Sequence, residues 1–180
     1  LMLVMIIYNL FLFTSIKDKS YLYYCLYLIG IVLNQMGISG HALYIAPPQA
    51  AALFTETFGI FYAFWAVQFV KSFLHTHNSP NANLLLNTLA AALIIPLYFL
   101  LSANHKLCIV SMNIIGIVIV MSVATIGIQS FRKGFKPARF FVLAWSFLLV
   151  GVLIFIVRGL GYIPSNLITE NSARIGAAIE

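Results

Sequence analysis

The sequence is short of charge, and of acidic residues most of all. Aspartate and glutamate supply only 4 of the 180 residues, and all charged types together make up 8%. Soluble domains carry about 25% charged residues because their surfaces face water. The scarcity therefore excludes a soluble globular domain. It also makes membrane-flanking loops a better explanation of the net charge of +6 than nucleic-acid binding.

Cysteine is scarce as well, and it gives no sign of a chemical site. Cys25 and Cys108 both lie inside apolar runs, where cysteine most often acts as a small packing residue. His75 and His77 have a spacing that could supply two metal ligands, but no Cys, Asp or Glu lies nearby to complete a site. The sequence therefore predicts no disulfide, no metal and no cofactor.

What the sequence has in abundance is long apolar runs, since 62% of its residues are hydrophobic. A spanning helix needs about 20 such residues, and these runs lack the period-two alternation of barrel strands. The sequence therefore predicts an all-α fold, a polytopic transmembrane helix bundle with six spans plus the start of a seventh. The predicted spans are residues 1–16, 21–45, 52–74, 84–102, 107–131 and 140–160, and the seventh starts near residue 172.

Both ends of the chain lie in apolar sequence. Residues 1–4 have no charged flank before them, and residues 176–180 have the composition of another helix that is beginning. Spanning helices normally have polar flanks. We therefore expect residues 1–180 to be a fragment of one seven-helix membrane domain, incomplete at both ends.

Basic residues are distributed unevenly between the predicted connections, and cytoplasmic connections are the ones enriched in Lys and Arg. The second, fourth and sixth connections and their flanks hold Lys106, Arg158 and Arg174. The first, third and fifth hold more, namely Lys17, Lys19, Lys71, Arg132, Lys133, Lys136 and Arg139. We therefore expect the first, third and fifth connections to be cytoplasmic. The basic loop from Arg132 to Arg139 is expected to lie on anionic lipid or on a cytoplasmic partner.

Ionisable residues inside spans are costly, so they are functional candidates by default. Glu56 and Arg158 fall near the outer ends of their spans, where contact with water or with each other would satisfy them. If the seventh helix starts near residue 172, Glu180 lies about 12 Å along it, close to the midplane. Asn9 has a similar depth on the first span. A hydrogen bond from Asn9 to Glu180 is therefore one hypothesis.

Gly37, Ser39 and Gly40, followed by His41, look like the nucleophile motif of intramembrane serine proteases. Such an enzyme needs its base on another helix at the depth of the serine. On a continuous helix His41 would point to a different side from Ser39. Small residues of this kind usually let helices approach closely, so we expect packing here and not catalysis.

Two further sets of side chains are expected to have structural roles. Uncharged polar residues inside spans should form hydrogen bonds between helices, each contributing about 0.6 kcal/mol. They are Asn34, Gln35, Gln68, Asn87, Asn113 and Gln129. An aromatic belt at the inner membrane edge is expected from Tyr21, Tyr23, Tyr24 and Tyr27.

The order of several local patterns resembles one family, the bacterial seven-transmembrane receptors with diverse intracellular signalling modules. The resemblance extends over nearly the whole chain, although no single pattern is specific by itself. The patterns are, in order, Tyr8-Asn9-Leu10, a short charged turn, Tyr21-Leu22-Tyr23-Tyr24, Gly40, Ala138-Arg139-Phe140-Phe141 with Trp145, residues 161–166, Thr169, Gly176 and Glu180.

The resemblance implies the membrane domain of a sensor in the bacterial inner membrane. An extracellular β-sandwich module would precede it in the same polypeptide, and a cytoplasmic diguanylate cyclase or histidine kinase would follow. The chain itself would then bind the lipid bilayer and catalyse no reaction, and a homodimer is left open. One alternative is a transporter or channel subunit, for which Pro96 is the only proline interior to a span. Another is a membrane-embedded enzyme, supported only by Ser39 and His41.

The Asn9 hypothesis makes a direct prediction. If Asn9 bonds to Glu180, Asn9→Ala removes a hydrogen bond between two spans and lowers the midpoint of thermal unfolding in detergent. The control is alanine at a neighbouring lipid-facing position of the same span. Equal losses for the two variants would rule the pairing out.

Overall fold

The computed structural model describes residues 2–44, 47–76, 79–134, 138, 141–146 and 150–151. These residues form helices and no strands, so the all-α prediction is confirmed for them. The chain divides into two units, residues 1–119 and 120–180, and each unit is described by itself.

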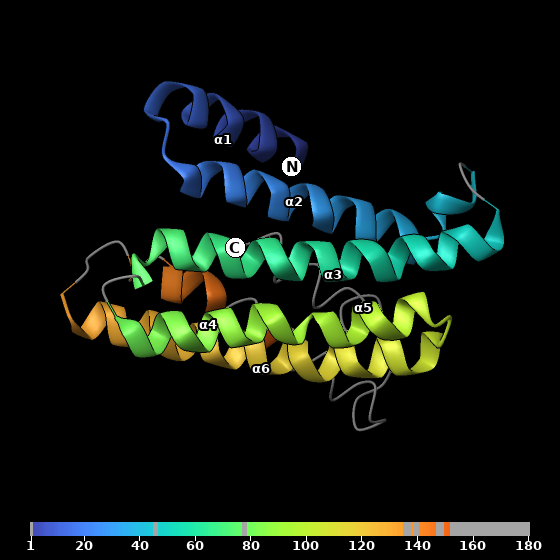
Figure 1. Ribbon diagram of the computed structural model, residues 1–180. Coiled ribbons are helices and arrows are strands. Elements are labelled where there is room, and N and C mark those ends of the chain that lie inside the picture. Colours follow the sequence, from blue (N-terminus) through green and yellow to red (C-terminus); the bar gives the residue numbers. More distant parts are fainter. Residues whose placement is uncertain are drawn as a thin grey trace. The chain divides into compact units, whose positions relative to one another are not determined.

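The helices follow one another through short connections (Figure 1). They are α1 (Met2–Ile16), α2 (Lys19–Ile38), the 3-10 helix η1 (His41–Tyr44), α3 (Pro48–Phe73), α4 (Pro80–Ala92), α5 (Ile94–Leu101) and α6 (His105–Arg132). Four stretches of the described chain are long and apolar enough to cross a membrane, and α1 is a shorter apolar helix. The four are Lys19–Ile38, Leu53–Phe73, Pro80–Leu101 and His105–Arg132.

The boundaries of α2 and α3 differ from the predicted spans because local turn chemistry decides them. Asp18 accepts a hydrogen bond from the Ser20 N–H at 2.8 Å, so α2 starts at Lys19, two residues before the predicted span. The span predicted to continue to residue 45 ends at Ile38, because Gly40 takes a left-handed φ of 78° that a helix cannot contain. Proline fits the first position of a helix, and α3 accordingly starts at Pro48.

The span predicted at residues 84–102 is two helices, with the break at Leu93. Pro96 has no N–H, so it cannot bond to the carbonyl four residues earlier, and its ring pushes that turn apart. Leu93, Pro96 and Leu100 are all buried, and α5 contacts α3. The break is therefore turned inward, against α3.

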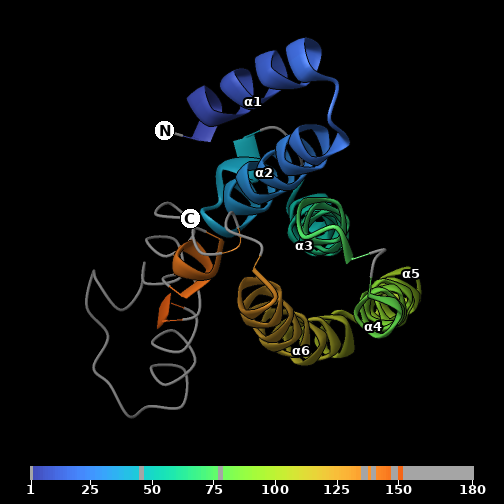
Figure 2. The same ribbon diagram turned by 90° about the vertical axis from the view of Figure 1, so that its left-hand side faces the viewer.

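The closest helix pair in residues 1–119 is α2 with α3, and two glycines allow the approach. A Cβ atom at Gly30 would lie 2.7 Å from the Tyr62 Cβ, and one at Gly37 would collide with Thr55. Figure 2 shows α1 on the far side of α2 from α3. Small residues let helix backbones approach in this way, so the expected packing role of Gly37 is confirmed.

Aromatic rings extend the same contact towards the start of α2. Ring centroids are 5.6 Å apart for Tyr23 and Trp65, and 5.0 Å apart for Tyr24 and Phe69. Tyr27 is 4% exposed and meets Tyr62 edge to face. The interpretation of these tyrosines as a lipid-facing belt is therefore wrong for Tyr27, which belongs to the helix contact.

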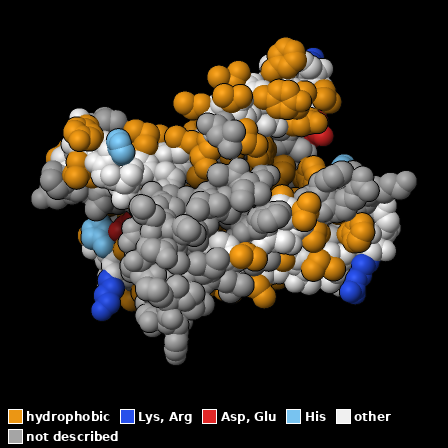
Figure 3. Space-filling view, turned by 180° about the vertical axis from the view of Figure 1, so that it is seen from behind, with side chains coloured by type: hydrophobic (Ala, Val, Ile, Leu, Met, Phe, Trp, Pro, Cys, Tyr) orange, Lys and Arg blue, Asp and Glu red, His pale blue; other side chains and the backbone are white. Residues whose placement is uncertain are grey.

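Apolar side chains cover much of the described surface, as expected where lipid is the solvent. Figure 3 shows them on one face. On α1 the exposed members include Leu3, Val4, Ile7 and Phe11, while Met2, Met5 and Ile6 pack against the cluster of Tyr27, Leu28, Ile31 and Ala66. The helix thus has one side towards α2 and another towards the surroundings.

In residues 120–180 the described contacts centre on the second half of α6. A Cβ atom at Gly127 would lie 3.2 Å from the Phe141 ring. Phe141 stacks on Trp145 with centroids 5.3 Å apart, and Ala138, Phe141 and Trp145 are all buried. Residues 138–141 and Trp145 carried part of the family resemblance, and their described members form a packing face.

The close contact at Gly30 predicts the effect of a single methyl group. Gly30→Ala should lower the free energy of unfolding by about 1–3 kcal/mol, because the new Cβ meets the Tyr62 Cβ and backbone, which cannot swing away. The matched control is Gly116→Ala, where a Cβ would meet nothing within 4 Å. Denaturant unfolding in micelles measures both variants. Equal stability of the two would contradict the close α2–α3 packing.

Candidate functional site

The described residues contain one buried acidic side chain, Glu56 on α3, and it is paired. Glu56 is 7% exposed, and both of its carboxylate oxygens lie 3.0 Å from Nδ1 of His105. His105 is the first residue of α6 and its side chain is 45% exposed. The contact therefore joins a buried anion to a ring that still reaches the surface. We take it as the candidate functional site.

A tight reversal between α5 and α6 places His105. The Ser102 N–H donates to the Tyr98 carbonyl at 3.0 Å and the Asn104 N–H donates to the Phe99 carbonyl at 2.9 Å. Ala103 takes a left-handed φ of 54° between them. Such a turn ends one helix by satisfying its last carbonyls. The chain can then reverse within three residues, so α6 begins beside the end of α5.

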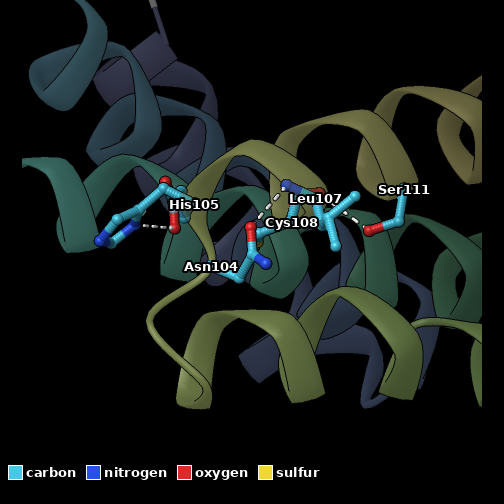
Figure 4. Close-up of polar contacts among 6 residues, drawn as sticks. Asn104, His105, Leu107, Cys108 and Ser111 are labelled. Carbon is cyan, nitrogen blue, oxygen red and sulfur yellow. Dashed lines mark hydrogen bonds and ion pairs between the residues drawn. The ribbon is translucent and has the colours of Figure 1, made fainter.

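The N-terminus of α6 explains why a carboxylate is stable there. The first turn of α6 contains no acidic residue of its own, and the unpaired N–H groups of a helix N-terminus attract negative charge. Glu56 supplies that charge from α3. Figure 4 shows the start of α6, where the side-chain oxygen of Asn104 accepts a bond from the Leu107 N–H and a dashed line joins His105 to its acceptor.

Cys108 lies one turn further along α6 and completes the surroundings of the carboxylate. Its side chain is fully buried and within hydrogen-bonding reach of Glu56. Cys108 is therefore in contact with a polar group, in contrast to the purely apolar packing role expected from the sequence.

A second interhelical bond lies one residue before Glu56. The Asn34 side-chain amide on α2 donates to the Thr55 carbonyl at 2.8 Å. Gly59 lies one turn after Thr55, and a Cβ there would approach Met112 of α6 to 2.8 Å. Two consecutive turns of α3 thus contact α2 and the first half of α6. The expected hydrogen-bonding role of Asn34 is confirmed.

This arrangement joins α3 to α6 through a carboxylate and an imidazole. Within the part of the chain that the structure describes, no three His, Cys, Asp or Glu side chains are grouped so as to hold a metal ion. Because the carboxylate and the imidazole are paired at a helix junction, the contact between α3 and α6 depends on the position of the His105 ring.

Each intramembrane pair expected from the sequence has one partner outside the described residues. Glu56 bonds to His105, and its suggested partner Arg158 lies outside the described residues. Asn9 donates to the Met5 carbonyl of its own helix at 2.8 Å, and Glu180 also lies outside the described residues. The Asn9–Glu180 bond therefore stays a prediction.

Two of the four cations of the predicted basic loop are described. Arg132 is in the last turn of α6 and Lys133 follows it, both exposed. Gly134 has a φ of 93° and its N–H donates to the Phe131 carbonyl, which ends the helix. Lys136 and Arg139 lie outside the described residues. Lipid or partner contact of this loop stays a prediction.

Ser39 and His41 are in contact, contrary to the expectation that they face different sides of a helix. The helix has ended at Ile38, and Ser39 Oγ lies 2.8 Å from His41 Nδ1. The hydroxyl also lies 2.6 Å from the Gln35 carbonyl, to which it donates. A hydroxyl has one proton, so the imidazole N–H donates to Ser39. The pair caps α2, and the serine is not poised to give its proton to a base.

These helices and their contacts define a multi-pass α-helical membrane protein, whose partner is the lipid bilayer. The sequence profile of the family described as 7TM diverse intracellular signalling matches residues 1–180. The chain therefore belongs to this family and is a membrane domain of a signalling protein. Comparison with curated proteins and with solved structures gave no match.

Sequence reasoning missed His105 as a partner of Glu56. The two residues are 49 positions apart, and His105 looked like a solvated loop residue beside Lys106. A usable signal was present, since both positions were expected at the same membrane edge and a buried carboxylate needs a partner.

A double-mutant cycle tests whether Glu56 and His105 are coupled. We expect Glu56→Gln and His105→Gln each to lower the free energy of unfolding, and the double variant to lose less than their sum. The expected coupling is about 1 kcal/mol, at the low end for contacting groups because the histidine is half exposed. His41→Gln, an exposed histidine at another helix end, is the control partner for Glu56→Gln. Additive losses for Glu56 and His105 would show that the contact contributes nothing.

Proposed function

We propose that this membrane domain relays ligand binding at an external sensor module to a cytoplasmic output module of the same polypeptide. The match to the signalling family over residues 1–180 carries the proposal. A diguanylate cyclase or a histidine kinase is the proposed output enzyme. The membrane domain itself positions these modules and catalyses no reaction.

The proposed topology is six spans and the start of a seventh in the bacterial inner membrane. The first, third and fifth connections face the cytoplasm, and the basic residues flanking α1, α3 and α6 support this orientation, with Lys17, Lys71 and Arg132 among them. The reversal between α5 and α6 then lies outside. The Glu56–His105 contact is accordingly near the external edge, where a sensor module could act on it.

The proposed mechanism is a shift between two helix packings, driven by the ligand's different affinity for each. The aromatic and glycine contacts between α2 and α3 make these two helices one rigid body. In contrast, α6 meets α3 through a polar pair with a half-exposed partner. Movement is proposed for α6 and the helices after it. The hinge that we propose for this movement is formed by Gly159, Gly161 and Pro164, which lie outside the described residues.

Helix α6 is long enough to carry such a movement through the bilayer. Its 28 residues correspond to about 42 Å at 1.5 Å per residue, more than the bilayer's hydrocarbon thickness of about 30 Å. It runs without interruption from His105 to Arg132. A displacement at the first residue would therefore reach the basic loop at the other edge.

The break in the fourth span favours a relay over a transporter. Broken helices of transporters direct unwound backbone and polar groups at a mid-membrane substrate site. Here the surroundings of the break are apolar, with Leu93, Ile94 and Leu97 beside Phe61 and Phe64 of α3. These side chains offer no ligand to an ion or a polar solute.

Disulfide locks in the full-length receptor test the relay. Cysteine pairs between residues 140–160 and the helix from residue 172 should abolish the change in enzymatic output on ligand addition, because they fix the helices proposed to move. The control is Ser20→Cys with Ser72→Cys, whose native oxygens are 2.9 Å apart across the rigid α2–α3 pair, and this lock should leave the response intact. A normal response with the first locks would contradict the mechanism.

Further experiments test the proposed orientation and the two rival functions. A membrane-impermeant maleimide should label Ser102→Cys from outside and Lys133→Cys only after lysis, and the reverse pattern would invert the topology. Solute flux through liposomes holding the purified protein would favour a transporter. Labelling of Ser39 by a serine-reactive probe would favour an enzyme.

A further inference from the structure

A groove lies between α3 and the broken helix α4–α5, within residues 1–119. Its volume is about 550 Å³, within the range of small-molecule sites. Its α3 wall is Thr57, Ile60, Phe61 and Phe64, and its other wall is Ala90, Ala91, Leu93, Ile94, Leu97 and Leu100. The break at Leu93 makes the space, because two straight helices would close on each other there.

The lining suits a hydrocarbon chain. It contains aliphatic and aromatic side chains, with one hydroxyl, that of Thr57. Ile94, which is 64% exposed, and the more moderately exposed Leu97 and Phe64 form part of the wall, so the groove is reachable from the surrounding lipid. An apolar chain is the occupant that costs least here, since any polar group would lose its hydrogen bonds.

Lys71 lies on the same face of α3 as the groove lining, nearer the C-terminal end of the helix. Residues three and four apart share a helix face, so the series Thr57, Phe61, Phe64, Gln68 leads to Lys71. On the other wall Asn87 precedes Ala90 and Ala91 by three and four positions. Lys71 Nζ donates to Asn87 Oδ1 at 2.6 Å. The two polar side chains therefore close the α3–α4 interface beyond the end of the groove.

The Lys71–Asn87 bond leaves donors available. A lysine ammonium has three N–H groups and an asparagine amide has two, and the bond from Lys71 to Asn87 uses one ammonium hydrogen. Among the described residues, no carboxylate forms an ion pair with Lys71. Such a donor group is complementary to a phosphate.

The distance along α3 from the groove to Lys71 matches the hydrocarbon thickness of one bilayer leaflet. Phe61 is ten residues before Lys71, about 15 Å along the helix and half the hydrocarbon thickness of a bilayer. From these observations we propose that a phospholipid with an anionic headgroup binds between α3 and α4–α5. One acyl chain lies in the groove at the Leu93 break, and the phosphate lies on Lys71 and Asn87. This site goes beyond the relay function and does not depend on it.

Native mass spectrometry of the purified chain tests the headgroup contact. The protein is delipidated in detergent and titrated with dioleoyl phosphatidylglycerol or, separately, dioleoyl phosphatidylcholine. We expect one phosphatidylglycerol per chain, retained in preference to phosphatidylcholine. Lys71→Gln keeps a donor for Asn87 but removes the charge, and it should weaken phosphatidylglycerol retention about fivefold, the effect of losing one cation near a lipid surface. Lys19→Gln, an exposed cation at the start of α2, should leave retention unchanged.

A second pair of variants tests the acyl chain. Ala91 lines the groove and is exposed, so Ala91→Phe should fill the space and reduce retention of both lipids while Lys71 stays intact. Ile95→Phe adds an aromatic ring at an exposed position beside the groove that does not line it, and it should bind as the native chain does. Unfolding midpoints of all four variants show whether each is folded.

Four results would overturn the proposal. The first is equal retention of the two lipids by the native chain. The second is equal loss in Lys71→Gln and Lys19→Gln, which would indicate only a general attraction to positive charge. The third is unchanged retention in a folded Ala91→Phe variant. Dimerisation of the native chain that Ala91→Phe abolishes would show that a second copy, and not a lipid, fills the groove.

Discussion

A polar group without a partner in the hydrocarbon core of a bilayer costs several kcal/mol, and most of this structure is a response to that cost. The backbone satisfies itself within helices. Where a helix ends, neighbouring groups complete the last bonds, as Asp18 does at the start of α2 and the residues around Ala103 do after α5. Side chains obey the same rule, so Asn34 bonds to a backbone carbonyl and Glu56 to His105.

Helix α3 takes part in most of the contacts between helices described above. It packs on α2 through glycines and aromatic rings, bonds to the first half of α6 through Glu56, and forms one wall of the groove with α4 and α5. In a bilayer the hydrophobic effect does not drive helices together. Close packing and polar bonds must therefore hold them in contact. Helix α3 makes close contacts or polar bonds with α2, α4, α5 and α6, and this explains why the candidate site and the groove lie on one helix.

The sequence predicted the features of the fold that depend on composition. It did not predict the features that depend on where a turn interrupts a helix. Apolar runs predicted the helices, because lipid requires about 20 such residues in a row whatever their neighbours are. Ser39 and His41 were expected to point apart, because the helix was assumed to continue past Gly40. The left-handed glycine ends it and brings them together. The inward break at Leu93 follows from Pro96, but the space beside it depends on α3 and could not be predicted.

Two of the polar contacts of α3 lie far apart along the helix. Glu56 and Lys71 are 15 residues apart, about 22 Å along the helix. The first contact joins α3 to α6 and the second joins α3 to α4. If α2 and α3 form the rigid unit proposed above, α3 does not bend between these points, and a tilt of α3 that alters one contact also alters the other. Headgroup binding at Lys71 would then change the energy of the Glu56–His105 pair, and coupling of this kind is reciprocal. A receptor built in this way would respond to its ligand with a sensitivity set partly by the lipid around it.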